Sequence, residues 1–221
     1  MSTIGIINYE IGNLRSVEKA FQASGAETRW VRSPQDMTDL SGLVLPGVGA
    51  FGDCIKGLRA IGMWDAVKEW VAADKPFFGI CVGYQMLFES SEETPGIEGL
   101  GIFKGRVVKF TDPKLKVPQI GWNTVAVKQK SPFLKGISDG TFFYFVHSYY
   151  PQGVDRSIVA LETDYGVTFT AAVTKGNLVA TQFHPEKSQK AGLQLVKNFV
   201  DLTEQKQSLK TKLTSTPGID S

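Results

Sequence analysis

Cysteine and histidine are scarce in this sequence, which has only 2 of each among its 221 residues. Cys54 and Cys81 could form at most one disulfide, so a disulfide-stapled scaffold is excluded and a reducing compartment is favoured. Neither Cys-x-x-Cys nor His-x-x-x-His occurs, and zinc sites typically use such spacings. We therefore expect no metal and no cofactor, and any thiol or imidazole chemistry must use these four residues.

An excess of one charge and long apolar runs are also missing. The 24 basic and 22 acidic residues give a net charge of +2, and the two signs are mixed along the chain. No basic block indicates a nucleic-acid surface. No stretch approaches the ~20 apolar residues that span a bilayer, and the N-terminus does not resemble a secretory signal. We expect a cytoplasmic protein with no nucleic-acid and no membrane partner.

The first 90 residues alternate short apolar runs with amphipathic stretches, a pattern typical of βα units on a mostly parallel sheet. The run PFFGI is apolar throughout, as expected for a strand buried on both faces. The pattern predicts strands at 3–8, 28–32, 42–47 and 76–80, and helices at 13–24 and 53–73.

After about residue 100 the segments favour β-structure, with a hairpin turning at Gly176-Asn177. A last helix is expected from Ser188, as its N-cap, to Thr203. The fold class is therefore α/β: an open, mostly parallel sheet flanked by helices, with an antiparallel β extension. We expect one domain over 1–203 and a polar, disordered tail over 204–221. Strands are predicted at 105–110, 123–128, 141–149, 157–163, 168–174 and 178–184.

The segment Gly-Ile-Cys-Val-Gly at 79–83 lies where an apolar strand turns into the helical stretch YQMLFESS. This spacing is the thiol version of the nucleophile elbow. Gly79 and Gly83 leave room for a strained turn that lifts the side chain of Cys81 from the strand end. The N-terminus of the following helix favours the thiolate form of Cys81.

The segment QFHPE at 182–186 supplies a candidate base and its partner. In an extended segment residues i and i+2 point to the same side, so His184 and Glu186 can lie together. Cys81, His184 and Glu186 then fill the roles of nucleophile, base and orienting group. His147 competes as the base, but no carboxylate lies near it in sequence, and we favour packing or gating for it. Cys54 is expected to be a packed thiol.

Acyl transfer also needs donors for the oxyanion. The N–H of Val82 follows the nucleophile, and the loop LPGVGAFGD offers a second donor from Gly47, Val48 or Gly49. The glycines of this loop space as Gly-x-Gly-x-x-Gly, but the acidic residue of a dinucleotide-binding fingerprint is missing.

GICVGYQMLFE and QFHPEKS together resemble the class I (triad) glutamine amidotransferases. Four segments, LPGVGAFGDC, GWN, FVHSYY and HPEKS, resemble one branch of them, the glutaminase subunit of imidazole glycerol phosphate synthase. The resemblance runs from residue 4 to about residue 202. The chain departs from it at Glu10, where the family usually has glycine, and at Val82 and Tyr84, where Leu and Met are common.

The resemblance implies a flavodoxin-like sheet and hydrolysis of glutamine to glutamate and ammonia through a glutamyl thioester on Cys81. The ammonia passes to a separate (β/α)8-barrel cyclase in a heterodimer that makes imidazole glycerol phosphate in histidine biosynthesis. The implied substrate-binding groups are Gly47, Gly49, Gln85, Ser148 and Tyr149, the oxyanion groups are Val48 and Val82, and the partner-interface residues are Asn8, Asn13, Trp122, Asn123 and Lys187.

Two other functions fit the same motifs. One is a stand-alone cysteine amidase, and the other is a non-catalytic, glutaminase-like regulatory subunit. The Pro-Gly-Val-Gly loop also suggests a regulatory hypothesis: a Val48 peptide with its carbonyl turned into the site would leave the oxyanion hole incomplete until the partner binds its ligand. One missing donor costs about 3 to 4 kcal/mol.

Overall fold

We describe residues 2–10 and 14–214 of a computed structural model of the chain. A single eight-stranded sheet runs through it, with five parallel strands followed by three antiparallel ones. This arrangement confirms the predicted sheet and the flavodoxin-like strand order. In spatial order the strands are β2 (Glu27–Val31), β1 (Thr3–Ile7), β3 (Gly42–Gly47), β4 (Phe77–Cys81), β13 (Leu178–Thr181), β12 (Thr168–Lys175), β11 (Val159–Asp164) and β8 (Ala126–Val127).

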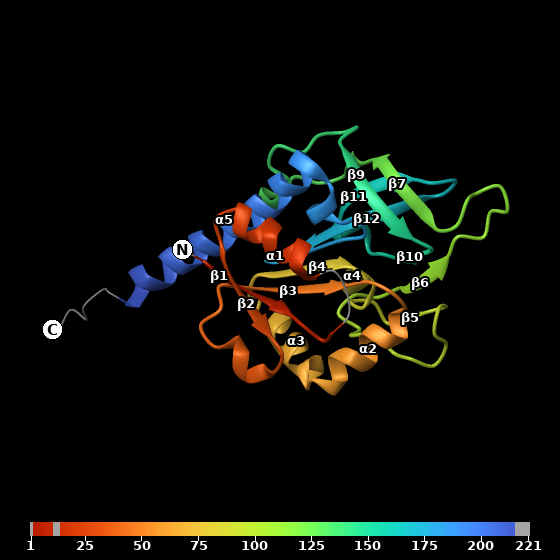
Figure 1. The fold of residues 1–221 in the computed structure, drawn as a ribbon. Coiled ribbons are helices and arrows are strands. Elements are labelled where there is room, and N and C mark those ends of the chain that lie inside the picture. The colour runs from red at the N-terminus through yellow and green to blue at the C-terminus, as the bar shows by residue number, and fades with distance from the viewer. Residues whose placement is uncertain (1, 11–13, 215–221) are drawn as a thin grey trace.

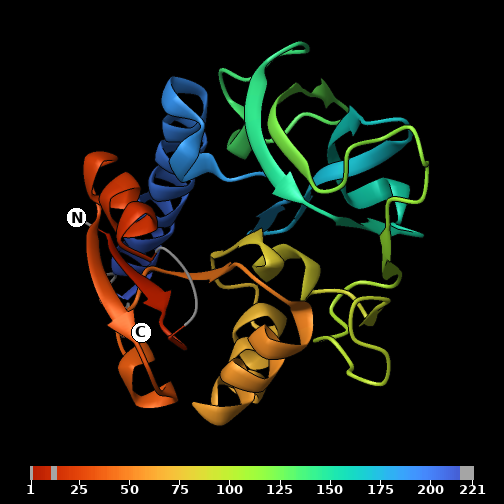
Figure 2. The same cartoon turned by 45° about the vertical axis from the view of Figure 1, so that its right-hand side comes forward.

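Helices cover both faces of the parallel half. Helices α1 (Leu14–Ala23) and α5 (Gln189–Thr214) lie on one face, and α2 (Phe51–Ala60) and α3 (Met63–Ala72) lie on the other (Figures 1 and 2). Phe78 of β4 packs against Phe21 of α1 and Phe199 of α5, with ring centroids 6.2 and 5.4 Å away. Strand β4 is buried along its whole length, as its apolar run predicts.

Two smaller sheets and several short helices complete the fold. Strands β7 (Gln119–Thr124) and β9 (Phe142–His147) pair antiparallel near the carboxyl end of the parallel strands (Figure 1). The other small sheet contains β10 (Tyr149–Gln152), β6 (Arg106–Lys109) and β5 (Ser90–Ser91). The short helices are α4 (Val82–Gln85), η1 (Pro34–Met37), η2 (Pro132–Leu134), η3 (Arg156–Ile158) and η4 (Pro185–Lys187).

The structure differs from the sequence predictions at several boundaries, and the strand expected over 123–128 is interrupted at Val125 between β7 and β8. The helix expected over 53–73 is divided into α2 and α3, because Gly62 has a left-handed φ of 70°. The strand expected over 141–149 divides into β9 and β10 around Ser148. Helix α5 continues past Thr203 to Thr214, because that stretch contains no Gly or Pro to end it.

The end of α5 extends beyond the body of the domain (Figure 1). Residues 215–221 of the predicted tail lie outside the described residues. Over the ranges 2–10 and 14–214, no helix is long and apolar enough to cross a membrane.

Candidate active site

Cys81 occupies a strained turn at the carboxyl end of β4. Its φ of 55° and ψ of −110° lie in a region that residues with side chains rarely adopt, which costs about 1 to 3 kcal/mol. The turn leads directly into α4, so the elbow predicted from the glycine spacing is confirmed as a backbone feature. Helix α4 is a single turn and is shorter than the helical stretch we expected. A single turn has only a small dipole, so α4 acts on the thiol less than the longer helix we expected would.

Glycines allow three backbone segments to meet under this turn. A Cβ on Gly83 would lie 1.9 Å from the carbonyl oxygen of Leu45 in β3, a separation that no packing change can accommodate. A Cβ on Gly79 would lie 3.1 Å from the carbonyl oxygen of Gly83. A Cβ on Gly47 would lie 2.7 Å from the backbone nitrogen of Gly83. Gly47 thus allows β3 to approach α4 closely, and it is not among the residues that line the cavity beside Cys81.

His184 and Glu186 form a buried pair. Nδ1 of His184 donates to Oε1 of Glu186 at 2.7 Å, and the two side chains are only 2% and 4% exposed. The predicted pairing is present, but the expected extended backbone is not, because the segment from Pro185 is the short helix η4.

Ser188 holds this segment against β9. Its hydroxyl accepts from the backbone nitrogen of Tyr144 at 3.0 Å and donates to the carbonyl of His184 at 2.6 Å. The hydroxyl is therefore used differently from the predicted helix cap. A Cβ on Gly192 would lie 1.9 Å from the carbonyl oxygen of Pro185, so this glycine allows α5 to pack on η4.

The charge state of His184 depends on its neighbours. Burial by itself lowers the pKa of His184, but the negative charges of Cys81 and Glu186 raise it to about 10. Its other ring nitrogen, Nε2, is buried and has no hydrogen-bond partner among the described residues. An imidazolium with a free Nε2–H beside a thiolate can deliver a proton to a leaving group.

A cavity of about 510 Å³ brings the two halves of the site together. Gly47 and Glu186 are not among the residues that line it. Glu93, Pro118, Val146 and His147, which were not predicted as binding residues, also line it. The predicted site residues that line it are Val48, Gly49, Cys81, Val82, Gln85, Ser148, Tyr149, His184 and Lys187.

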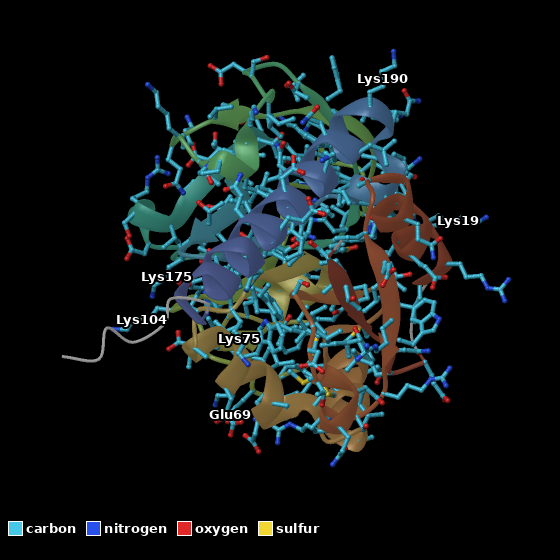
Figure 3. The ribbon with its side chains drawn as sticks, turned by 90° about the vertical axis from the view of Figure 1, so that its left-hand side faces the viewer. Lys19, Glu69, Lys75, Lys104, Lys175 and Lys190 are labelled. Atoms are coloured by element: carbon cyan, nitrogen blue, oxygen red, sulfur yellow. The ribbon has the colours of Figure 1, made fainter. Side chains whose placement is uncertain are left out.

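A larger cavity, of about 760 Å³, lies at the opposite end of the parallel strands. It is lined by residues at the start of β4 and β13, including Lys75 and Leu178. Figure 3 shows Glu69, Lys75 and Lys175 on this side of the molecule. Its wall contains no cysteine or histidine, whereas the smaller cavity is lined by Cys81 and His184. The smaller cavity is therefore the candidate active site.

The loop that follows β3 is held from behind by Tyr9 and Cys54. The hydroxyl of Tyr9 donates to the carbonyl of Pro46 at 2.6 Å, and Sγ of Cys54 donates to the carbonyl of Val48 at 3.4 Å. The Val48 carbonyl thus faces α2, which differs from the inward carbonyl that the sequence suggested. Cys54 is fully buried, and burial raises its pKa to about 11, as expected of a packed thiol.

His147 is a neutral, packed residue. Burial lowers its pKa to about 4, and it lies among the rings of Phe110, Phe145 and Phe169. Nδ1 of His147 donates to the carbonyl of Tyr149 at 2.8 Å. The prediction of a packing role is consistent with these contacts, and Glu186 pairs with the other histidine.

Two polar residues of the site were not predicted. Gln182 is completely buried beside Cys81, and the carboxylate of Glu93 accepts from the backbone nitrogen of Phe51 at 2.7 Å where it lines the cavity. Gln182 belongs to the same QFHPE segment as His184, so the motif could have indicated it. No sequence signal marked Glu93. Gln85 donates to the carbonyl of Tyr149 at 3.0 Å.

The predicted interface residues are placed in different ways. Trp122 is 45% exposed on β7, and Lys187 is exposed at the cavity rim. The amide nitrogen of Asn123 instead donates to the carbonyl of Asp164 at 2.7 Å, and Oδ1 of Asn8 accepts from the backbone nitrogen of Glu10 at 3.0 Å. Asn13 lies outside the described residues.

Glu10 itself has a φ of 65°, a conformation that glycine adopts more readily than glutamate. Within the described part of the chain, no group of three His, Cys, Asp or Glu side chains is arranged to hold a metal ion.

A strained thiol that shares a cavity with a buried histidine–carboxylate pair, at the carboxyl edge of a mostly parallel sheet, is an arrangement typical of enzymes with a cysteine nucleophile. The chain belongs to the class-I glutamine amidotransferase family, whose model matches residues 5–202.

The most similar relatives that we compared share one name within this family. The imidazole glycerol phosphate synthase subunit HisH of Rhodopirellula baltica is 51% identical over 197 residues, which are 89% of this chain and 96% of that protein. The protein of the same name from Methanosarcina acetivorans is 46% identical over 204 residues, or 91% of this chain and 100% of that one.

Solved structures support the fold alone, because their identities are low. A crystal structure of a glutamine amidotransferase has a TM-score of 0.72 at 21% identity, over 91% of this chain and 98% of that one. The structure of PurLQS from Thermotoga maritima has a TM-score of 0.73 at 19% identity, over 91% and 99% of the two chains.

Proposed function

We propose that this glutamine amidotransferase hydrolyses glutamine with Cys81, His184 and Glu186 as its catalytic triad. The observation that carries the proposal is the buried hydrogen bond of 2.7 Å between His184 and Glu186, in a cavity wall shared with the strained Cys81. This arrangement provides a nucleophile, a proton carrier and a group that fixes the carrier's orientation.

The reaction proceeds in two steps. The thiolate of Cys81 attacks the side-chain amide carbon of glutamine, and the N–H of Val82 and a donor from the Val48 loop bind the oxyanion. His184 then gives its Nε2 proton to the amide nitrogen, so ammonia leaves and a glutamyl thioester remains. Water attacks this thioester while His184 takes a proton from the water. Glutamate leaves, and the thiolate is restored.

The cavity has groups suited to both ends of the substrate. Gln85 and the backbone of Gly49, Ser148 and Tyr149 face the substrate, as the family resemblance implies, and Gly47 shapes the floor by allowing β3 to approach the elbow. The carboxylate of Glu93 provides a negative charge for the α-ammonium group.

The chain acts as the glutaminase subunit of imidazole glycerol phosphate synthase in histidine biosynthesis, by its likeness to relatives of that name. The ammonia passes to a separate (β/α)8-barrel cyclase, in a heterodimer. Both cysteines are free thiols, which fits a cytoplasmic location.

The cyclase docks on the outer face of β7 and β9. The side chains of Ile120, Trp122 and Phe142 are 59%, 45% and 56% exposed there. Neighbouring apolar side chains of this size on one sheet face are typical of interaction surfaces. Lys187 and Val146 line the cavity mouth beside this face, so a docked partner would cover the route by which ammonia leaves.

Two measurements on the purified chain test this function. The first is glutamate release from glutamine, with and without the cyclase. We expect faster release in the complex than by the chain alone, because a docked partner would close the cavity mouth to water. Full activity alone, with ammonia from small amides, would instead support a stand-alone amidase.

The second measurement is labelling with an electrophilic glutamine analogue. We expect modification of Cys81 that is lost in Cys81→Ala. An unmodified Cys81 would support the non-catalytic regulatory subunit, and a label on Cys54 would contradict the proposed nucleophile.

A further inference from the structure

The side chain of Gln182 contacts both the nucleophile Cys81 and the cavity residue Gln85, and it has no part in the triad. It directly follows β13, two residues before His184, and its side chain is completely buried. Its Oε1 accepts from Nε2 of Gln85 at 3.1 Å, and its Nε2 approaches Sγ of Cys81 at 3.9 Å. Burying an amide costs free energy unless its polar atoms are hydrogen-bonded, and both of these contacts of Gln182 are with residues of the site.

Hydrogen-bond partners determine the orientation of the Gln182 amide, that is, where its nitrogen and its oxygen lie. The carbonyl of Tyr149 can only accept, so the amide of Gln85 must turn its nitrogen toward it, at 3.0 Å. The same nitrogen meets Gln182, which must therefore present its oxygen to Gln85. The nitrogen of Gln182 is then left facing Cys81. The chain of hydrogen bonds runs one way and ends with an N–H directed at sulfur.

We propose that Gln182 is a positioning residue that favours the thiolate of Cys81 and couples it to Gln85 in the substrate pocket. The inference rests on the proposed function. A donor that faces an ionisable group favours its charged form. At 3.9 Å the contact is long, so Gln182 acts as a buried amide dipole aimed at the sulfur rather than through a short hydrogen bond. Because the same amide orients Gln85, its loss alters glutamine binding as well as thiol reactivity.

Other groups also act on the sulfur, and the test must separate them from Gln182. His184 carries the nearest positive charge, with Glu186 behind it. The remaining titratable groups in the cavity wall or near the sulfur are Tyr9 from the loop after β1, Cys54 from α2, Glu93, His147, Tyr149 and Lys187.

Two variants remove different contacts of Gln182. Gln182→Met keeps the side-chain length but removes the donor to Cys81 and the acceptor for Gln85. Gln182→Glu keeps an oxygen for Gln85 and replaces the donor to Cys81. Gln129→Met is the matched control, because Gln129 also loses two hydrogen bonds, to Ile158 and Thr174, but lies away from the cavity.

The measurement is the pH profile of Cys81 alkylation by iodoacetamide, with the modified residue located by mass spectrometry, together with kcat and KM for glutamine in the cyclase complex. We expect Gln182→Met to be alkylated about tenfold more slowly at neutral pH, with the midpoint of the profile moved to higher pH. Gln182→Glu should be slower still, because its carboxylate also repels the thiolate. The KM should rise more in Gln182→Met than in Gln182→Glu, because only the latter keeps the acceptor for Gln85.

Gln129→Met should show the wild-type profile even if it melts at a lower temperature. A wild-type profile in either folded Gln182 variant would overturn the proposal, and the second variant serves if the first does not fold. Failure of the proposed function would give another result: the wild-type protein itself would lack glutaminase activity and analogue labelling at Cys81.

Discussion

Oε1 of Glu186 accepts a hydrogen bond from Nδ1 of His184 in the interior of the protein, with the two atoms 2.7 Å apart. The bond fixes which ring nitrogen of His184 remains for chemistry. It also places a negative charge where it stabilises the imidazolium.

Glu186→Gln removes that charge while keeping the shape of the side chain. We expect kcat for glutamine hydrolysis to fall about 100-fold or more, because proton transfer by His184 becomes less favourable. The control is Glu162→Gln, which removes another mostly buried carboxylate, paired with Lys128 and Arg156. That variant should lose stability but keep its kcat. Equal losses of kcat in the two variants would show that Glu186 acts on the fold and not on His184.

Neither histidine should change its protonation state in a pH titration near neutrality. The pKa of His184 is raised to about 10 by the charges of Cys81 and Glu186 against the effect of burial, and burial lowers that of His147 to about 4. Proton NMR of the rings should therefore show no titration between about pH 5.5 and 8.5, where an unperturbed histidine changes charge.

Cys81→Ser provides the comparison for this titration. Burial lowers the pKa of His184, and without the thiolate only Glu186 remains to counteract this effect. The pKa of His184 should therefore fall, and its titration should move toward neutral pH. An unchanged His184 signal in this variant would mean that the thiolate is not the source of its raised pKa.

The glycines of the elbow should differ in their tolerance of alanine. Gly83→Ala forces a Cβ to within 1.9 Å of the Leu45 carbonyl oxygen, and we expect a loss of about 3 kcal/mol or more from the free energy of unfolding. Gly79→Ala meets its neighbours at 3.1 Å and should cost less. Denaturant melts of the two variants measure the difference. A smaller loss in Gly83→Ala than in Gly79→Ala would contradict this packing.

Local patterns predicted the parallel half of the fold well. The apolar run of β4 and the glycines around Cys81 depend on contacts made within a few residues or on one buried face, which sequence periodicity reports directly. The break at Gly62 was missed because a glycine inside a helical pattern can be tolerated or can end the helix. The end of α5 was missed because its sequence is polar and has no apolar stripe, although such residues can still favour helix.

The site could be predicted only in part, for a different physical reason. Cys81 and His184 are far apart in the sequence, and only the pairing of β13 with β4 brings their segments together. His184 and Glu186 do meet, but through the turn of η4 rather than along an extended strand. Gln182 and Glu93 carry no motif of their own, and their positions depend on the packing of distant segments.

Trp122 should anchor the partner subunit. Its ring is 45% exposed on the outer face of β7 and packs edge-on against Tyr144 of β9, so it is held in place before binding. Large aromatic anchors in protein interfaces typically contribute 2 kcal/mol or more. We expect Trp122→Ala to weaken binding of the cyclase about 30-fold or more, as measured by calorimetry, while analogue labelling of Cys81 in the isolated chain stays unchanged.

Val167→Ala is the matched control for this prediction, because Val167 is 38% exposed in the turn between β11 and β12, outside the β7–β9 face. It should bind the cyclase with wild-type affinity. If Trp122→Ala bound equally well, the exposed apolar face of β7 and β9 would not be the docking surface. If both variants lost affinity, the contact would have to extend to the β11–β12 turn. Loss of affinity in Trp122→Ala alone would place the cyclase over the mouth of the cavity, where Val146 of β9 and Lys187 meet the route of ammonia.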